Sequence, residues 1–515
     1  MPARKHKTHD RKRILTLGQG LAVLALQCLP GVSYGAETPA ASSTQSLSSA
    51  GRPGVLGLDD AELPAFGRVA EHDRRTVGFD SSYYFYDSEA KKSQPFYPSI
   101  GTRLKGGRQT LWLEGEWNVT AQVIVNPKAS QFTVEMPQGY VATSRLLGPV
   151  QLSVGRRLEH WNHLDEKWGM GLWQPRFRWD YLRPEPVAFT GAYVNVTEKY
   201  FQLAAMGSPV FVPDRGVSID AQIGSISSSS PWFISPPSQI LVLNKPTPVN
   251  YQLVVPPMAE IVLRPSLSLM ARAGQENEGP WASVAYSYKP MNQLLLGYDG
   301  KDKLSEVRDG SVVSAQVYPR VLNHHLTSVE AGCNGQVFRG WVSGLLERPV
   351  RDNTPSSWTT QEVADALSMS ASAEWTFARP AGSFGVPSRL DLSVLRVVGG
   401  YAADGGPFST GSGSVFDSRY PFQTAVSLGL ESSLAPLGGF ARRVSGSWRL
   451  LQDLGNSGQI VSAELRVRPS PGLMVAVGAD VLGSDSAAGS GVTGPDFIGR
   501  YRANDRVHAG VSYAF

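Results

Sequence analysis

The sequence predicts an all-β fold, a transmembrane antiparallel β-barrel of roughly 16–18 strands, with 18 favoured. Three observations support this prediction: a charged and then apolar N-terminal stretch, repeated segments in which apolar and polar residues alternate, and a C-terminal strand that ends on Phe515. In a soluble sandwich the apolar face of such strands would be buried, whereas in a membrane barrel it would meet lipid. The alternation alone does not separate these two folds, but the three observations together favour the barrel.

Residues 1–35 have the layout of a secretory signal peptide. Six basic residues precede a mostly apolar stretch at 14–29, and Ser33 and Gly35 are small residues suited to cleavage after Gly35. Cleavage would change the formal net charge from +4 to −1, so the basic balance of the full sequence gives no case for nucleic-acid binding. It would also leave Cys333 as the only cysteine, which excludes an internal disulfide in the mature chain.

The rest of the chain divides into two parts. Residues 36–75 are rich in Ala, Ser, Pro and Gly and are expected to form a flexible periplasmic segment. Residues 76–515 are expected to form the outer-membrane β-barrel. A mature chain of this length could also hold several soluble domains. After the signal peptide we find no long apolar run, so no helical membrane span is expected.

The alternation is clearest in residues 111–125. Leu111, Leu113 and Trp117 lie on one face of this stretch, and Glu114 and Glu116 lie on the other. The turn signal that follows, with Pro127, predicts an antiparallel hairpin. Similar strands are predicted at 76–86, 131–136, 150–156, 187–196, 281–289, 311–317, 367–377, 422–431, 444–450, 461–468 and 506–515.

Three segments interrupt this pattern and predict long extracellular loops. Residues 225–257 contain several prolines, which lack the N–H that a strand ladder requires. We therefore expect a loop there, either extracellular or folded into the lumen. Residues 399–420 and 483–500 are rich in Gly and Ser and are expected to form further loops.

Residues 155–185 carry the candidate functional site, because four tryptophans and five arginines lie within one irregular stretch. One interpretation is a loop that constricts the lumen, in which indole faces stack on sugar rings and guanidiniums bind hydroxyls, carboxylates or phosphates. The other is an interface girdle or packed plug in which the same side chains are structural. The candidate substrate-binding residues are Arg156, Arg157, Trp161, Trp168, Trp173, Arg176, Arg178, Trp179 and Arg183.

The sequence does not predict an enzyme. His160 and His163 lie near acidic residues, but such a group is common in sequences and no obvious partner for a metal site follows. We find no nucleophile elbow, no zinc-protease motif and no phosphate-binding loop. No catalytic, cofactor or metal residue is therefore expected, although an outer-membrane hydrolase whose triad is assembled across strands stays open as an alternative.

The C-terminal spacing of His508, Gly510, Tyr513 and Phe515 resembles the insertion signal of bacterial outer-membrane barrels. Gly155-Arg156-Arg157 and the block at 208–216 also resemble the outer-membrane barrels of polysaccharide export. This group includes alginate-type exporters, exopolysaccharide-secretion porins and capsule-assembly lectin barrels. The resemblance implies an outer-membrane location, contact with outer-membrane lipid and the barrel-assembly machinery, and no nucleic-acid partner.

The same resemblance implies a function. It predicts a porin that translocates an exopolysaccharide or capsular polysaccharide. Because the chain has no periplasmic helical-repeat domain, the polymer would have to come from a separate periplasmic polysaccharide export protein and an inner-membrane co-polymerase. Two alternatives remain open: a passive diffusion porin for small solutes, and a surface lectin barrel that anchors capsule.

Overall fold

The computed structural model describes residues 73–515 except 86–94, 126–129, 145–146, 218, 223–224, 229, 234–237, 243–244, 275–277, 300–312, 351–358, 382–385, 406–418 and 485–495. All described residues belong to the compact unit Gly51–Phe515. The expected signal peptide at 1–35 and nearly all of the expected flexible segment at 36–75 lie outside the described residues. So do parts of the loops expected at 399–420 and 483–500.

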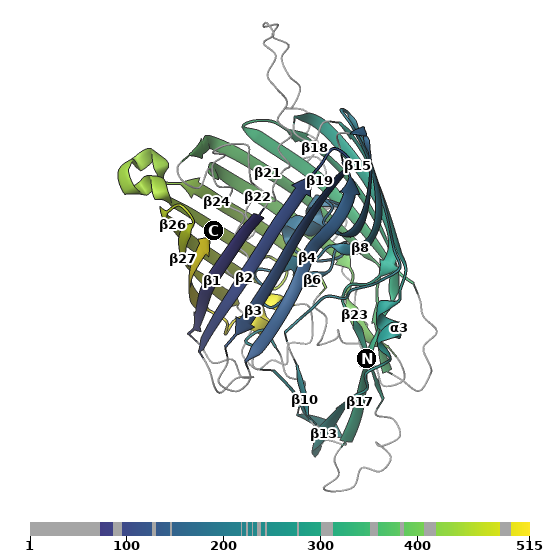
Figure 1. Ribbon diagram of the computed structural model, residues 1–515. Coiled ribbons are helices and arrows are strands. Elements are labelled where there is room, and N and C mark those ends of the chain that lie inside the picture. Colours follow the sequence, from purple (N-terminus) through teal and green to yellow (C-terminus); the bar gives the residue numbers. More distant parts are fainter. Residues whose placement is uncertain are drawn as a thin grey trace, which may run out of the picture. The chain divides into compact units, whose positions relative to one another are not determined.

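The dominant feature is a closed antiparallel barrel of 18 strands (Figure 1). Each strand pairs with its neighbour along the chain, and β1 pairs with β28 to close the ring, so Thr76 lies opposite Ala514. Closure leaves the barrel sheet without a first or last edge strand, which is what a sheet in lipid requires. The predicted fold class is confirmed, at the favoured strand number. The barrel strands are β1 (Asp73–Tyr84), β2 (Phe96–Gln109), β3 (Leu113–Ile124), β4 (Gln131–Thr143), β5 (Val150–Arg157), β8 (Phe189–Glu198), β9 (Phe201–Ser208), β14 (Ser266–Gly274), β15 (Gly279–Pro290), β18 (Asn323–Asn334), β19 (Phe338–Pro349), β21 (Ala366–Ala381), β22 (Val386–Gly399), β24 (Thr424–Ser433), β25 (Val444–Asp453), β26 (Gly458–Ser470), β27 (Leu473–Ser484) and β28 (Arg506–Ala514).

The two faces of the wall differ as the alternation predicts. In β21, Ser368 and Ser370 face the lumen and are buried, whereas Leu367 and Met369 face outward and are exposed. In β28, Tyr513 is likewise exposed on the outer face. An apolar outer surface on strands of this length matches a wall that spans a membrane.

The two ends of the barrel also differ. At the end where β1 begins and β28 stops, connections are short: residues 110–112 join β2 to β3, and 471–472 join β26 to β27. We call this the short-turn end. At the other end, the long-loop end, connections such as 158–188 and 209–265 are long enough to reach across the barrel. In transmembrane barrels short turns face the periplasm and long loops face outward.

Strands from four long loops form a second sheet of six strands beyond the barrel wall, in the order β12-β13-β17-β16-β20-β23. Two expectations are corrected here. The stretch expected as a strand at 311–317 contributes to β17 of this loop sheet, not to the barrel. The proline-rich loop contains a hairpin in which Pro246 and Pro248 pair with β12. They are tolerated because their half of β13 pairs on one side only, while 249–253 pairs with β17.

The remaining elements are short and lie in the connections. Among the described residues, no helix is both long and apolar enough to cross a membrane. These elements are α2 (His163–Trp168), β6 (Arg176–Phe177), β7 (Glu185–Pro186), β10 (Asp220–Gln222), β11 (Ser225–Ser227), β12 (Gln239–Val242), β13 (Lys245–Leu253), α3 (Met258–Val262), β16 (Leu295–Asp299), β17 (Val313–Arg320), β20 (Thr359–Val363), β23 (Ala402–Gly405), η2 (Ala435–Leu437), η3 (Gly439–Arg443) and α5 (Phe497–Tyr501).

Candidate functional site

Residues 158–188, which we call the constriction segment, leave the wall after β5 and return to it at β8. The segment holds α2, β6 and β7, and Figure 1 shows β6 within the outline of the barrel. Its side chains contact lumen-facing residues on opposite sides of the wall, including Glu330 of β18 and Asp480 of β27. The segment therefore lies across the lumen, as the sequence analysis expected for this region.

The local structure of the segment is determined by α2 and its caps. The side chain of Asn162 accepts a hydrogen bond from the Asp165 N–H at 2.8 Å, which caps the first turn. The helix ends at Gly169, whose φ of 64° is the left-handed conformation that glycine adopts without strain. The Asp165 carboxylate then accepts from the N–H groups of Leu172 and Trp173, so the chain turns back beneath the helix.

Three indoles of the segment lie in a buried apolar cluster that also includes residues of the wall. Trp161 and Trp173 stack with ring centroids 5.7 Å apart and planes within 5°, and both are almost fully buried. Trp168 is also buried, and its Nε1 donates to Ser370 Oγ on β21 at 3.0 Å. The faces of Trp161 and Trp173 thus meet each other within a buried apolar cluster that includes residues of the wall. Trp179 is only half-buried, and it packs edge-on against Phe177.

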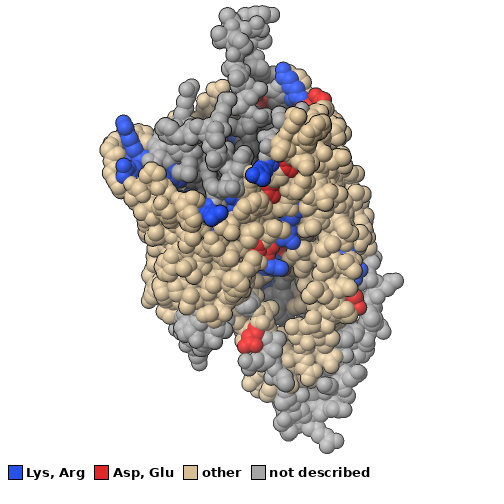
Figure 2. All heavy atoms as spheres, viewed as in Figure 1, with Lys and Arg blue, Asp and Glu red and all other residues tan. Residues whose placement is uncertain are grey.

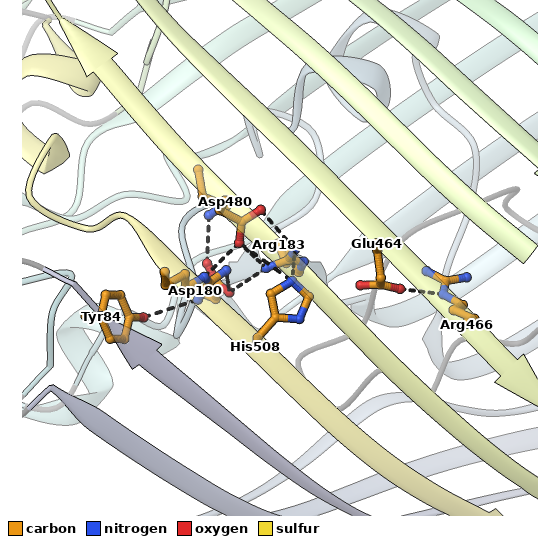
Figure 3. Close-up of polar contacts among 9 residues, drawn as sticks. Tyr84, Asp180, Arg183, Glu464, Arg466, Asp480 and His508 are labelled. Carbon is orange, nitrogen blue, oxygen red and sulfur yellow. Dashed lines mark hydrogen bonds and ion pairs between the residues drawn. The ribbon is translucent and has the colours of Figure 1, made fainter.

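A network of ion pairs holds one end of the segment against the β27–β28–β1 side of the wall (Figure 3). Arg183 forms a two-pronged pair with Asp480, at 2.7 and 3.0 Å. Arg506 donates to Asp180 at 2.5 Å and to Asp480 at 2.7 Å. Arg183 also lies 2.9 Å from Nε2 of His508, which must be the acceptor because a guanidinium only donates. Two arginines and two aspartates thus neutralise one another in a buried cluster.

The other end of the segment is tied to the opposite wall. The His163 backbone N–H and ring Nδ1 bond the two oxygens of Glu330, at 2.8 and 3.0 Å. The His163 ring also stacks on Trp281 of β15. Lys167 pairs with Asp391 of β22 at 2.6 Å. Anchors on both sides keep the segment from swinging freely out of the lumen.

A third anchor joins the segment to the loop that follows β9. Asp214 accepts from the Arg176 backbone N–H at 2.7 Å and pairs with Arg178 at 3.1 Å. Arg178 also donates to the Met170 carbonyl at 2.6 Å. Burial raises the pKa of the Asp214 carboxyl, and the Arg178 guanidinium opposes that shift. Both arginines therefore have partners within the fold.

A second loop is fixed to the wall by a fully buried cluster. The Glu347 carboxylate of β19 accepts from Arg419 at 3.0 Å and from the Tyr420 hydroxyl at 2.6 Å, both in the connection between β22 and β24. It also lies 2.6 Å from Nδ1 of His324 on β18. A buried carboxylate with three partners is stable only while all of them are present.

A polar hollow remains between the constriction segment and the β2–β4 side of the wall. Arg103 of β2 pairs across it with Glu185 of the segment at 2.9 Å. On the wall side, Glu135 of β4 accepts from Arg156 at 2.8 Å and from Arg215 at 2.6 Å. The hollow is lined by Arg103, Thr120, Gln122, Thr133, Glu135, Phe177 and Glu185.

The structure brings the nine sequence-predicted site residues together in or beside the constriction segment. Seven of them lie within it. Arg157 lies at its start and donates to Gln151 and Ser153, while Arg156 faces away from the lumen on β5. Sequence reasoning missed their acidic partners Asp180, Asp214 and Asp480. Asp480 could have been predicted as a site residue, because it is the only acidic residue in a mostly apolar strand.

Among the described residues, no group of three or more His, Cys, Asp or Glu side chains is placed to hold a metal ion. His160, one of the two histidines considered above, lies with its Nδ1 at 3.0 Å from the Glu166 carboxylate.

No protein-family model and no curated protein sequence matches the chain. Three solved structures align with most of the chain at low identity and with TM-scores below 0.5. OccAB3 of Acinetobacter baumannii is 8% identical with a TM-score of 0.45, covering 86% of this chain and 98% of its own. OccK11 (OpdR) of Pseudomonas aeruginosa is 12% identical with a TM-score of 0.42, covering 86% and 95%. A mutant of the Rh. blastica porin is 9% identical with a TM-score of 0.36, covering 86% and 99%.

Proposed function

We propose that the protein is an outer-membrane porin that lets small hydrophilic solutes diffuse through a charged constriction. The observation that carries this proposal is the constriction segment, which crosses the lumen, is anchored on opposite walls and leaves a polar hollow beside β2–β4. A fixed segment with charged side chains at its edge limits the size of a solute and selects by charge.

This geometry favours small solutes over a polysaccharide, the substrate that the sequence resemblance implied. A polymer would have to pass the segment, whose anchors include the buried pairs of Arg183 and Arg506 with acidic partners. Two of the indoles expected to bind sugars, Trp161 and Trp173, are stacked on each other. Export would require displacement of the segment together with its apolar core.

Reconstitution into planar bilayers and liposomes tests the proposal. We expect a stable open conductance, and swelling of liposomes in small sugars but not in long dextrans. Absence of both conductance and solute flux would contradict a diffusion porin. A deletion strain that loses surface polysaccharide, with synthesis intact and with restoration by the intact gene, would instead support export.

Two charge substitutions make the test specific to the hollow. Arg103→Gln leaves Glu185 without its partner and should shift ion selectivity toward cations, whereas Glu185→Gln should shift it toward anions. Arg442→Gln is a matched control, because Arg442 is exposed at the short-turn end and outside the hollow. Equal selectivity in all four proteins would show that ions do not pass through this hollow.

A further inference from the structure

The barrel wall is incompletely paired at one place, between β4 and β5. These strands pair over only four residues, from Gly139 opposite Arg156 to Ala142 opposite Ser153. On its other side β4 pairs with β3 from Gln131 opposite Ile124 to Thr143 opposite Leu113, with one bulge at Met136 and Pro137. The half of β4 that precedes Gly139 therefore has no ladder on the β5 side, because β5 ends and the chain turns into the lumen.

Glycines allow the wall to bend where this break begins. Gly155 of β5 has φ of 127°, and a Cβ atom there would lie 2.4 Å from the Gly139 carbonyl oxygen. A Cβ atom on Gly191 of β8 would lie equally close to the Gly207 carbonyl oxygen. Only glycine permits these approaches, so the sequence specifies the bend at which β5 leaves the ladder.

An ion pair passes through the break from one face of the wall to the other. Glu135 shares the inner face of β4 with Thr133, beside Arg103 and Thr120 in the hollow. Arg156 lies on the outer face of β5, where its Nε bonds the Thr190 hydroxyl. These two side chains nevertheless meet at 2.8 Å. In a continuous wall the inner and outer side chains of neighbouring strands are separated by the sheet.

The break lies beside an apolar outer surface. On the unpaired half of β4, Phe132, Val134 and Met136 face outward and are exposed by 67%, 50% and 42%. Backbone groups at this edge bond outside the ladder, with Met136 O accepting from Arg156 and Pro137 O from the Ala188 N–H. Open sheet edges do not occur in hydrocarbon unless protein groups cover them, so these two partners satisfy the edge where the wall lacks its ladder. Figure 2 shows basic and acidic side chains gathered in the middle of this face.

We propose that this break is a lateral port, and that it takes an amphiphile with an anionic head group and an acyl chain. The head group would bind at the edge of the hollow, where Arg156 and Arg215 contact Glu135 and Arg103 contacts Glu185, so that the three arginines outnumber the two carboxylates by one positive charge. Arg215 offers the most accessible guanidinium, since its side chain is 53% exposed. The acyl chain would leave between β4 and β5 along the apolar surface and remain in the membrane.

Site-directed fluorescence quenching tests the port directly. In a Cys333→Ser background, single cysteines replace Thr133, Val134 or Ser462 and carry an environment-sensitive dye. Thr133 faces the hollow, Val134 faces lipid, and Ser462 faces the lumen on β26, which is paired on both sides. In vesicles of phospholipid with nitroxide-labelled acyl chains, we expect quenching at position 133 to approach that at 134 and to exceed that at 462. Equal quenching at positions 133 and 462 would overturn the port. It would mean that lipid does not reach the break, either because the wall closes there or because a second copy of the chain covers it.

Titration with nitroxide-labelled stearate tests the head-group site. Arg215→Gln should lower the affinity for stearate, measured as quenching at position 133, about tenfold. This is the effect of losing one charge-assisted hydrogen bond. Arg348→Gln is the matched control, because Arg348 is an exposed arginine near the long-loop end of β19. Acetate should compete poorly, because it has the charge without the chain. Unchanged affinity in Arg215→Gln, or competition by acetate equal to that by stearate, would overturn the proposal. Neither result would decide the proposed porin function, which the conductance measurement tests separately.

Discussion

Replacing Asp180 by Asn should loosen the constriction segment without unfolding the barrel. Asp180 Oδ2 accepts from Arg506 Nη2 at 2.5 Å, and its Oδ1 accepts from the Leu182 N–H at 2.9 Å. Asn keeps the shape and the second acceptor but loses the charge. Arg506 retains Asp480, so the loss is one charge-assisted hydrogen bond, about 1.5–3 kcal/mol. That corresponds to a rise of roughly 10–150-fold in the population of the detached segment.

Hydrogen exchange measures this change where it occurs. Amides of the peptide 176–186 should exchange faster by the same factor, whereas amides of β21 and β22 should be unaffected because the barrel stays closed. Channel recordings should show more frequent transitions to a larger conductance. Glu431→Gln is the matched control, since it removes the partner of Arg389 on the wall without touching the segment.

Two results would refute the reasoning. The first is identical exchange of 176–186 in the wild-type and Asp180→Asn proteins. The second is additivity with Arg183→Gln, because side chains of one network should couple and give non-additive effects. Additive effects would mean that the two pairs hold different parts of the segment independently.

Three further predictions follow from other contacts. Deletion of Phe515 should lower the amount of assembled barrel on heat-modifiability gels, because its backbone pairs with Arg75 where the barrel closes, at 2.9 Å from N to O; normal assembly would contradict this. Glu347→Gln should cost about 3–5 kcal/mol, as loss of one partner from a buried ionic cluster does, and lower the thermal midpoint; an unchanged midpoint would show that the cluster is not structural. Lys167→Met should remove the partner of Asp391 and raise the cation-to-anion permeability ratio in reversal-potential measurements, and an unchanged ratio would exclude this pair from the ion path.

The faces of the barrel were predictable because they depend only on the period of the chain. The sequence placed Arg506 and His508 on the polar side of the last strand, and the structure brings both to the lumen side in the network around Asp480. The same reasoning failed at 311–317, where alternation correctly predicted a strand but not its sheet. A two-residue period indicates two different faces, and it carries no information about which partner strand supplies the hydrogen bonds.

The partners within the lumen were not predictable from local patterns. Arg506 and Asp180 are 326 residues apart in the chain and meet only because β28 closes the barrel beside β1. The proline-rich loop was misjudged for a related reason. Pro246 is compatible with a strand whose other edge is unpaired, and that edge is defined only once β17 pairs further along β13.

The tryptophans of the constriction segment were expected to bind a substrate, but most of them are buried in the fold. Inside the barrel, three indoles of the segment form one buried apolar cluster with side chains of the wall, among them Met206, Met270 and Leu326. Burial of an aromatic side chain contributes roughly 1.5–3 kcal/mol, and the stacked pair Trp161 and Trp173 adds a favourable ring contact.

Such a core makes the segment stiff and directs its indole faces inward. Most of the groups left at the hollow are then charged or polar, among them Arg103 and Glu185, with Phe177 beside them. In the proposed porin, a solute at this point would therefore meet charged and polar groups more than a series of stacking surfaces. Trp179, half-buried beside Phe177, is the indole best placed to meet a solute. The proposed porin would accordingly select solutes by charge and size.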